Sequence, residues 1–519
     1  MNEPSILSLL PPILALLMIV ATRKVLPSLG VGIIIGALVL SDWSITEGAV
    51  LIWEIFAGIF VADGSINDWE LYIIFFLLIL GIMAALISFS GGSRAFGEWA
   101  LKRVKTRIGA QLVTLLFGIL VFIDDYFNSL TVGQVSRPLT DRHHISRAKL
   151  AYIVDSVAAP ICVIAPLSSW GAYIITIIAD ILSSHNQTQY GGLQAFLYMV
   201  PMNFYAMTAL LFVFLAIVWK LDFGPMRTHE KRAIMHHQVL DPDRTGVPGE
   251  QSQHLDEHKG KVRDLIIPIL VLIASTVVFM IVTGAQAADE VTALSVFAET
   301  DVASSLVYGG LIGLGVTVLL TLTKRPAVTG FIKTVFAGMQ SMLPAIYILI
   351  LAWIIVSIID QLGTGQYLAD FIDGTIPLFL LPALLFLLAG FMAFSTGTSW
   401  GTFSILLPIA GEIAAALDIS LILPMLAAVL AGSILGDHCS PISDTTILSS
   451  TGAGSHHIDH VITQLPYAFF SAVGAFAGYL ILGATGSTLT GLTAALLITI
   501  GIAFLFKITR KPIADENKG

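Results

Sequence analysis

Five aspartates lie within apolar stretches of this chain, where a charged side chain is costly to bury. The stretches are FIDDYFNSLTVG (122–133), DSVAAPICVIAPLSS (155–169) and GDHCSPISDTTILSS (436–450). The five residues are Asp124, Asp125, Asp155, Asp437 and Asp444. Ionisable groups inside membrane-embedded segments usually mark the path of an ion or a substrate. For each aspartate, the alternative is a structural role in helix capping or packing.

Hydroxyl, amide and imidazole side chains surround these aspartates. With the five carboxylates, the candidate ion or substrate ligands are Asn128, Ser129, Ser395, Thr396, Thr398, Ser399, His438, Ser440, Ser443 and Thr445. Hard cations prefer oxygen ligands, and the glycines and prolines of the same stretches free backbone carbonyls by interrupting helices. The predicted Na+ site consists of Asp124, Asn128, Thr396, Asp437 and Asp444.

A buried carboxylate also explains proton exchange. Removal from water favours the protonated form of a carboxyl group, and a bound cation favours the ionised form. A proton and a cation therefore compete for the same oxygens. A site of this kind that opens alternately to each side of a membrane exchanges one ion for the other.

Asp124 and Asp125 are adjacent. On a regular helix their side chains would point about 100° apart, so the two do not share one site. We expect one of them to bind the ion and the other to cap the N-terminus of a half-helix, where a negative charge is favoured.

Three other features leave two interpretations open. His438 either titrates near neutral pH or hydrogen-bonds within its own stretch. The string HHIDH (456–460) has spacing compatible with a metal site, but its place at a helix start favours capping or pH sensing. Trp170, Trp400 and Tyr126 either line a pocket for an organic solute or pack like other aromatic residues of membrane helices.

Composition places the chain in a membrane. Of its 519 residues 56% are hydrophobic and only 12% are charged, and the mean hydropathy is +0.87, whereas soluble domains carry about 25% charged residues. Apolar runs of about 20 residues can cross a bilayer as helices. The predicted crossings are 5–21, 24–40, 70–90, 148–183, 196–219, 264–284, 302–323, 338–359, 419–450, 461–483 and 488–506. The predicted fold class is an all-α polytopic membrane protein with about eleven transmembrane helices.

The distribution of Lys and Arg predicts the orientation, because cytoplasmic loops are enriched in both. Basic residues cluster at 23–24, 94–107, 137–149, 220–263, 324–333 and from 507 onward. One path satisfies every cluster, with the N-terminus outside and the C-terminus in the cytoplasm. It requires two re-entrant hairpins, 108–136 from the cytoplasmic side and 376–412 from outside. We interpret 48–62 as interfacial, and a crossing there would change this map.

With these hairpins the chain divides into two inverted repeats that share one order of elements. The predicted divisions are a first repeat 1–220, a cytoplasmic linker 221–263, a second repeat 264–485, and a C-terminal transmembrane helix and cytoplasmic tail 486–519. Each repeat contains a hairpin (108–136 and 376–412) and a broken helix (148–183 and 419–450). Secondary transporters have this architecture and bind their substrates near the midplane of the membrane.

The strings GDHCSPISDTTILSS and FIDDYFNSLTVGQVSRPLTD (122–141) resemble those of the NhaC family of Na+/H+ antiporters, within the ion transporter superfamily. The resemblance extends over nearly the whole chain. It implies two inverted repeats, hairpin tips that meet broken helices, a homodimer with an elevator-like motion, and a bacterial inner membrane. Some members of this family exchange malate and lactate with sodium coupling or take up amino acids such as methionine. The resemblance therefore implies sodium coupling more firmly than it implies the transported partner.

The leading hypothesis is a Na+/H+ antiporter, and the alternative on the same fold is a Na+-coupled transporter of an amino acid, a dicarboxylate or lactate. The sequence contains no GxGD and no HExxH motif, which argues against an intramembrane enzyme. An ion channel fits less well, because two inverted broken-helix units suit alternating access. The expected partners are Na+, H+, the lipid bilayer and a second copy of the chain, with no cofactor and no nucleic acid.

Overall fold

The computed structural model of this chain is nearly all helical. It describes residues 6–22, 24–62, 65–185, 187, 190–242, 259–287, 296, 300–364, 367, 375–509 and 513. This described part contains ten helical segments long and apolar enough to cross a membrane, or up to twelve if each of two bent helix pairs forms a further span. The expected polytopic α-helical fold is confirmed. Two short antiparallel strands, β1 (Val61–Ala62) and β2 (Ser65–Ile66), form the one sheet in the described part of the chain.

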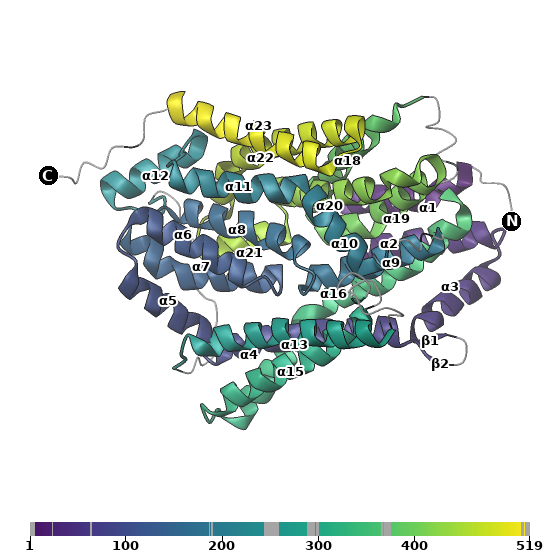
Figure 1. The fold of residues 1–519 in the computed structure, drawn as a ribbon, viewed down its shortest axis with the longest axis horizontal. Helices are drawn as coiled ribbons and strands as arrows, with labels where there is room; N and C mark the ends of the chain where they lie inside the picture. The colour runs from purple at the N-terminus through teal and green to yellow at the C-terminus, as the bar shows by residue number, and fades with distance from the viewer. Residues whose placement is uncertain are drawn as a thin grey trace.

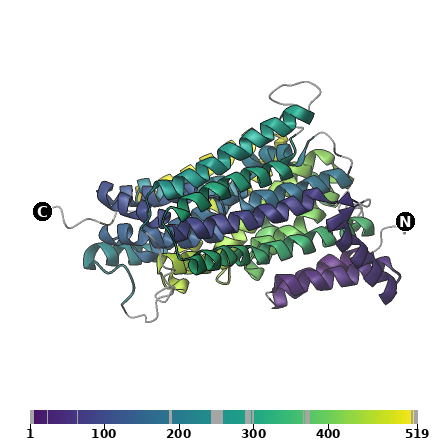
Figure 2. The same ribbon diagram turned by 90° about the horizontal axis from the view of Figure 1, so that it is seen from below.

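The helices form three layers in the view of Figure 1. The bottom layer contains α4, α13 and α15, the middle layer contains α6 to α9 with α19 to α21, and the top layer contains α11, α22 and α23. Most helices run along the long axis of the molecule, as the view from below also shows (Figure 2). The helices of the middle layer therefore lie between two walls of long helices.

The first half contains five α-helices, α1 to α5, before its hairpin begins. The elements are η1 (Ile6–Leu9), α1 (Leu10–Thr22), α2 (Val25–Leu40), α3 (Ile45–Phe60), α4 (Asp68–Phe89), α5 (Gly92–Arg103), α6 (Arg107–Leu120), α7 (Asp125–Arg142), α8 (Arg147–Ile164), α9 (Ser169–Ser184), α10 (Gly192–Met199), η2 (Val200–Met202) and α11 (Phe204–Val218). Helices α6 and α7 form the predicted first hairpin, and α8 with α9 forms the predicted first broken helix.

The second half repeats this order after the linker helix α12 (Gly224–His236). Its elements are α13 (Arg263–Ala287), α15 (Val302–Leu322), α16 (Val328–Leu362), η3 (Leu378–Leu380), α18 (Leu381–Thr396), α19 (Ser399–Leu417), η4 (Ile419–Leu421), α20 (Ile422–Cys439), α21 (Asp444–Ala453) and α22 (His457–Thr485). Helix α23 (Thr488–Thr509) follows as the extra C-terminal helix. Helices α18 and α19 form the second hairpin, and α20 with α21 forms the second broken helix.

Local capping explains where the broken helices restart. Ser168 accepts a hydrogen bond from the Gly171 N–H at the start of α9, and Ser443 accepts one from the Thr446 N–H at the start of α21. Serine is a preferred N-cap residue because its hydroxyl satisfies a backbone donor that the helix leaves free. A proline stands two residues before each of these serines, where continuation of the preceding helix is disfavoured.

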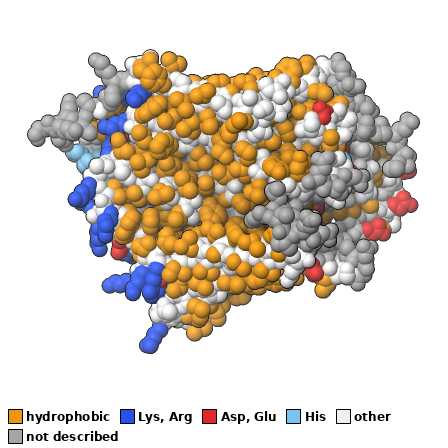
Figure 3. Space-filling view, in the orientation of Figure 1, with side chains coloured by type: hydrophobic (Ala, Val, Ile, Leu, Met, Phe, Trp, Pro, Cys, Tyr) orange, Lys and Arg blue, Asp and Glu red, His pale blue; other side chains and the backbone are white. Residues whose placement is uncertain are grey.

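Charge separates the two ends of the molecule. In Figure 3, Lys and Arg side chains gather at the left end and Asp and Glu side chains gather toward the right, with an orange apolar band between them. We call these the basic end and the acidic end. The first hairpin has Arg107 and Arg142 at its two outer ends, whereas the second, over 376–412, contains no Lys or Arg. Basic residues therefore flank the first hairpin and not the second, and entry of the two hairpins from opposite sides of a membrane stays a prediction.

The N-terminal region differs from the expected crossings. Helices α1 and α2 have 13 and 16 residues, fewer than the roughly 20 that cross a bilayer. The stretch interpreted as interfacial is helix α3, which is bent by 119° from the helix before it. This bend is compatible with an interfacial helix. Residues 243–258 of the predicted linker (221–263), Arg23 and most of the predicted tail beyond 509 lie outside the described residues.

Candidate ion-binding site at the hairpin tips

Each hairpin tip contacts the break of its own half. In the first half, Ile123 O accepts from Ser169 N–H at 2.9 Å, and Cys162 Sγ–H donates to Phe122 O at 3.2 Å. In the second half, Ser440 Oγ–H donates to Phe394 O at 2.8 Å. Because a break interrupts a crossing between its two halves, each tip lies partway along the length of a crossing.

Gly397 makes the second tip possible. Its φ is +70°, in the left-handed region that side chains other than glycine rarely adopt. A Cβ at this position would also lie 2.5 Å from the carbonyl oxygen of Ile442 in the second break. Glycine therefore lets helix α18 end and lets the tip approach the backbone of the break.

The two tips meet at a cavity of about 180 Å³. Its walls come from the first tip, the second tip, the second break and the long helix α16. The lining residues are Asp124, Asp125, Tyr126, Ser341, Met342, Pro344, Ile348, Thr396, Gly397, Thr398, Trp400, Ile442 and Asp444. Three carboxylates from two halves of the chain thus line one space.

Asp124 and Asp125 differ in their hydrogen bonds, and Asp124 forms the predicted helix cap. Asp124 is the N-cap of α7, with Oδ1 accepting from Phe127 N–H at 3.0 Å and Oδ2 accepting from Ser169 Oγ–H at 2.8 Å. Asp125 is 1% exposed, and neither of its carboxylate oxygens accepts a hydrogen bond from any described residue. The indole N–H of Trp170, which faces Asp125, is also buried without a described partner. Asp125 therefore has oxygens available for a ligand.

Asp444 joins the second half to the first tip. It is the first residue of α21, where a negative charge is favourable. Its Oδ2 accepts a hydrogen bond from the Tyr126 hydroxyl at 3.2 Å. This bond connects residues 318 positions apart in the sequence.

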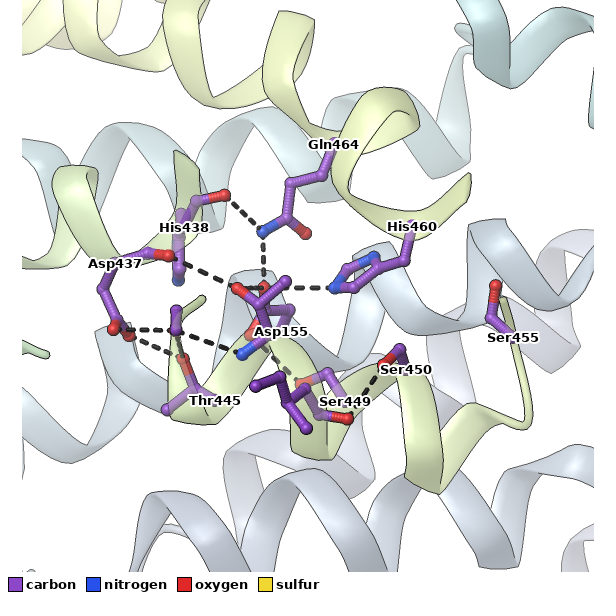
Figure 4. Close-up of polar contacts among 12 residues, drawn as sticks. Asp155, Asp437, His438, Thr445, Ser449, Ser450, Ser455, His460 and Gln464 are labelled. Atoms are coloured by element: carbon purple, nitrogen blue, oxygen red, sulfur yellow. Dashed lines mark hydrogen bonds and ion pairs between the residues drawn. The ribbon is translucent and has the colours of Figure 1, made fainter. Parts of the chain in front are cut away.

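Asp437 lies in a separate, closed network shown in Figure 4. Its carboxylate accepts hydrogen bonds from Ser443 Oγ–H at 2.8 Å and from Thr445 Oγ1–H at 2.6 Å. It is 2% exposed and does not line the cavity. The break folds back on Asp437, so that the hydroxyls following the break satisfy the carboxylate preceding it.

Asp155 is the centre of the same network, accepts hydrogen bonds from three side chains and lies beside a histidine. Thr446 donates at 3.3 Å, Ser449 donates at 3.1 Å, Gln464 donates through Nε2, and His460 Nε2 lies 3.3 Å away. Gln464 also donates to the backbone oxygen of His438 at 2.9 Å (Figure 4). A buried charge surrounded by this many donors is well stabilised, which indicates that Asp155 holds α8 against α21 and α22.

With this geometry in place, comparison with known proteins identifies the chain. The model of the Na+/H+ antiporter family matches residues 161–484. This chain belongs to the Na+/H+ antiporter family. The resemblance seen in the sequence is thereby confirmed at the level of the family. The matched range includes the second tip and the second break, whereas Asp124, Asp125 and Asp155 precede it.

One relative in sequence and two solved structures are similar to this chain. An uncharacterised protein of Haemophilus influenzae is 47% identical over 508 residues, which cover 97% of this chain and 96% of that protein. The fold is similar to that of MtrF of Neisseria gonorrhoeae, which is described within a class of antimetabolite efflux pumps. The TM-score is 0.50 at 15% sequence identity, and the match covers 86% of this chain and 85% of MtrF. It is also similar to the YdaH transporter of Alcanivorax borkumensis, at a TM-score of 0.55 and 14% sequence identity. That match covers 85% of this chain and 90% of the transporter. These two likenesses show the fold alone.

The predicted site residues of this antiporter-family chain fall into three groups. Those that line the cavity are Asp124, Asp125, Thr396, Thr398 and Asp444. Those in the closed network are Asp155, Asp437, His438, Ser443 and Thr445. Those that hydrogen-bond the backbone or lie apart from both are Asn128, Ser129, Ser395, Ser399 and Ser440.

The third group has identifiable tasks at the tips. Asn128 Nδ2 donates to the carbonyls of Gly118 and Val121, at 2.7 and 2.9 Å, and so closes the turn of the first tip. Ser395 donates to Phe391 O within its own helix, and Ser399 donates to Ser433 O. Of the predicted Na+ ligands, Asp124, Thr396 and Asp444 share the cavity, while Asn128 and Asp437 lie outside its lining.

Sequence reasoning missed the residues of α22 that complete the closed network. Gln464 and His460 reach Asp155 from α22, and they stand four residues apart, which places them on one helix face. The HHIDH string contained this signal, but its histidines separate: His457 contacts the Pro441 carbonyl at 2.6 Å, and His460 contacts Asp155. No group of three or more potential metal ligands occurs among the described residues.

The second tip also weakens one argument made from sequence. GTSWG (397–401) has the letters of the GxSxG nucleophile motif, so the argument against an enzyme from absent motifs holds only for GxGD and HExxH. That motif needs a strand-to-helix turn with an exposed serine. Here Ser399 follows a helix, is 2% exposed and donates to a backbone carbonyl. The string therefore forms a hairpin tip.

Proposed function

We propose that this protein is a Na+/H+ antiporter that exchanges cytoplasmic Na+ for external H+ by alternating access. The family and the transporter fold support secondary transport. The observation that carries the finer proposal is Asp125, whose two buried carboxylate oxygens accept no hydrogen bond from any described residue. An unpaired buried carboxylate is costly when ionised. It is therefore stabilised either by a proton or by a cation, which is the choice that exchange requires.

The cation in this proposal binds between the first tip and the second break. Asp125 and Asp444 supply carboxylate oxygens, Asp124 adds a third negative charge, and the Thr396 hydroxyl lies in the same lining. These are the oxygen ligands that a hard cation prefers. Asn128 and Asp437 stay in the proposal as residues that hold the tip and the break in position.

The position of the cavity supports alternating access. Met342 and Pro344 of the long helix α16 form one wall, and the tips and the second break form the opposite wall. A ligand at this boundary changes sides of the membrane if the tips and breaks move together along α16. We propose that the basic end faces the cytoplasm of a bacterial inner membrane, on the positive-inside rule, with the N-terminus outside and the C-terminus inside.

A Na+-coupled transporter of a small organic solute is the second candidate, and the apolar wall favours it. Tyr126, Trp400, Met342 and Ile348 line the cavity beside the carboxylates. Organic-ligand pockets usually measure about 300–1,000 Å³, larger than the 180 Å³ of this cavity. Its size therefore supports an ion with a few waters over a solute such as methionine. A homodimer remains a prediction from the family resemblance.

Everted membrane vesicles provide the test. Sodium added to energised vesicles should collapse the pH gradient in the wild type across pH 7–9. Asp125→Asn should raise the sodium concentration needed by at least about 100-fold, because a lost contact between buried charges costs about 3 kcal/mol. Ser395→Ala is the matched control, since its hydroxyl bonds within its own helix, and it should behave like the wild type.

Two results would contradict the proposal. Wild-type exchange in Asp125→Asn would remove this carboxylate from the site. Sodium-dependent uptake of a labelled amino acid or dicarboxylate, without any effect of sodium on the pH gradient, would select the second candidate instead.

A further inference from the structure

A second pocket lies at the basic end, away from the tips. It has a volume of about 530 Å³ and lies between the end of α5, the turn into α6 and the end of α7. Its lining residues are Glu98, Leu101, Lys102, Val104, Lys105, Arg142 and His143. We propose that this pocket binds the phosphate headgroup of an anionic phospholipid. The proposal does not depend on which ion the protein transports.

The charge of the lining favours an anion. Lys102, Lys105 and Arg142 are exposed and contribute three positive charges around one space. The single carboxylate, Glu98, already pairs with Arg94 at 3.4 Å. Basic pockets between helices at a membrane surface are the usual binding sites of anionic lipid headgroups.

The pocket is held in shape by contacts between its elements. Arg142 Nη1–H donates to Leu101 O at 3.0 Å, which ties the end of α7 to the end of α5. Gly97 of α5 packs against Val135 of α7, where a Cβ would lie 3.0 Å from the Val135 carbonyl oxygen. The positive charges therefore come from two elements fixed against each other.

His143 adds a buried ring nitrogen without a described partner. It lines the pocket, and its Nε2 atom is buried and makes no hydrogen bond to a described residue. Burial lowers the pKa of the His143 imidazole; a hydrogen bond with the Val104 backbone opposes this shift, and the charges of Arg142 and Arg107 add to it. The ring is therefore neutral at neutral pH and available for a hydrogen bond to a ligand oxygen.

The surroundings of the pocket favour a lipid over a soluble anion. Trp99 of α5 is 45% exposed, and tryptophan is enriched at the membrane–water interface. Helix α6 begins two residues after Lys105, and it exposes Leu116 and Ile119, which are 61% and 39% accessible. These side chains offer an apolar surface to acyl chains, next to the basic pocket. A headgroup bound here would contact both ends of the first hairpin.

Lipid retention measured by native mass spectrometry tests the proposal on the purified full chain. Wild-type protein, delipidated and then mixed with equal amounts of phosphatidylglycerol and phosphatidylcholine, should retain phosphatidylglycerol preferentially. In the double variant Lys102→Ala/Lys105→Ala, the ratio of retained phosphatidylglycerol to phosphatidylcholine should fall about tenfold. Each basic residue near a membrane surface contributes on the order of 1 kcal/mol to the binding of an anionic lipid. The charge-matched control Arg325→Ala/Lys333→Ala, outside the pocket lining, should keep it.

The possible outcomes separate the alternatives. An equal loss in the control variant would show general surface electrostatics and overturn the site. Full competition by glycerol 1-phosphate, which has the headgroup chemistry but no acyl chains, would show a free-phosphate site and overturn the lipid assignment. Elution of both double variants as monodisperse particles in size-exclusion chromatography confirms that they are folded.

Discussion

The two hairpin tips occupy equivalent positions in the two halves, but they differ in chemistry. The first tip starts helix α7 with Asp124, whose carboxylate caps the helix, followed directly by Asp125. The second tip starts α19 with Thr398, whose side chain makes no capping hydrogen bond, after Gly397 in the left-handed conformation. The carboxylates are therefore found at one tip only.

The two breaks differ in the opposite sense. The first break, 165–168, contains no carboxylate and is followed by Ser169, which donates to the carboxylate of the first tip. The second break, 440–443, stands between Asp437 and Asp444. The acidic tip of the first half and the acidic break of the second half meet through Tyr126 and Asp444.

The internal repeat and the divergence between its two copies contribute different properties to the site. The repeat supplies two tips and two breaks with the same backbone design, which two-fold architecture can place around a central site. The divergence concentrates negative charge on one tip and on the opposite break. As a result, three carboxylates from the two halves line one cavity.

Asp437→Asn tests whether the charge of the second break is essential, and it has the largest expected effect. The variant should abolish exchange, with a loss of about 100-fold or more, because the amide cannot accept from both Ser443 and Thr445 without presenting a donor to one of them. Sodium-induced collapse of the pH gradient in everted vesicles measures it. Asp301→Asn, at an N-cap remote from the tips where asparagine also caps well, is the control. Normal exchange by Asp437→Asn would remove this residue from the mechanism.

Asp155→Asn tests whether the carboxylate that the first half contributes to the closed network is structural. The variant should lower the stability by about 2–3 kcal/mol, because it leaves buried donors such as Ser449 unsatisfied. Thermal stability in detergent, followed by fluorescence-detected size-exclusion chromatography, measures the loss. A variant as stable as the wild type would contradict the structural role.

Ser168→Ala and Ser443→Ala compare the two breaks directly. Each variant removes an N-cap and should cost about 1 kcal/mol of stability. Only Ser443→Ala also removes a donor to a carboxylate of the second break, so only this variant should weaken sodium-dependent exchange, by about tenfold. Equal transport losses in the two variants would mean that the breaks do not differ in function.

The smallest expected effect concerns the contact between two histidines at the outer end of the first hairpin. His144 follows the first hairpin and packs against His237 after the linker helix, with ring centroids 4.0 Å apart and the ring planes tilted by 46°. Burial lowers the pKa of His144, and His237, Arg107 and His143 lower it further.

The sign of the pH effect follows from this shift. Because the folded state binds a proton on His144 less readily than the unfolded state, stability should fall as the pH drops below about 6.5. The loss is small for an exposed ring, on the order of 1 °C in melting temperature between pH 7.5 and 5.5. His144→Gln should reduce this dependence, and an unchanged pH profile in the variant would assign the effect to other groups.

Much of the architecture could be predicted because its causes are local. Apolar runs gave the crossings, the Lys and Arg clusters gave the ends, and proline with a capping serine marked both breaks. Helices α1 and α2 lie on the predicted apolar runs, but they have only 13 and 16 residues, because an apolar run alone does not show where a helix ends. The orientation of helix α3 could not be predicted from sequence alone. Its apolar run is too short to distinguish a membrane crossing from an interfacial helix.

The sequence by itself determined which residues could do chemistry and that they would gather at tips and breaks, because caps, breaks and hydropathy depend on near neighbours in the chain. Only the tertiary structure decided how these residues are shared between the cavity and the closed network. Asp444 faces Tyr126, whereas Asp437, seven residues earlier, turns toward Ser443. That choice, and the contribution of α16 to the cavity, depend on the rotation and packing of helices hundreds of residues apart, which no local pattern encodes.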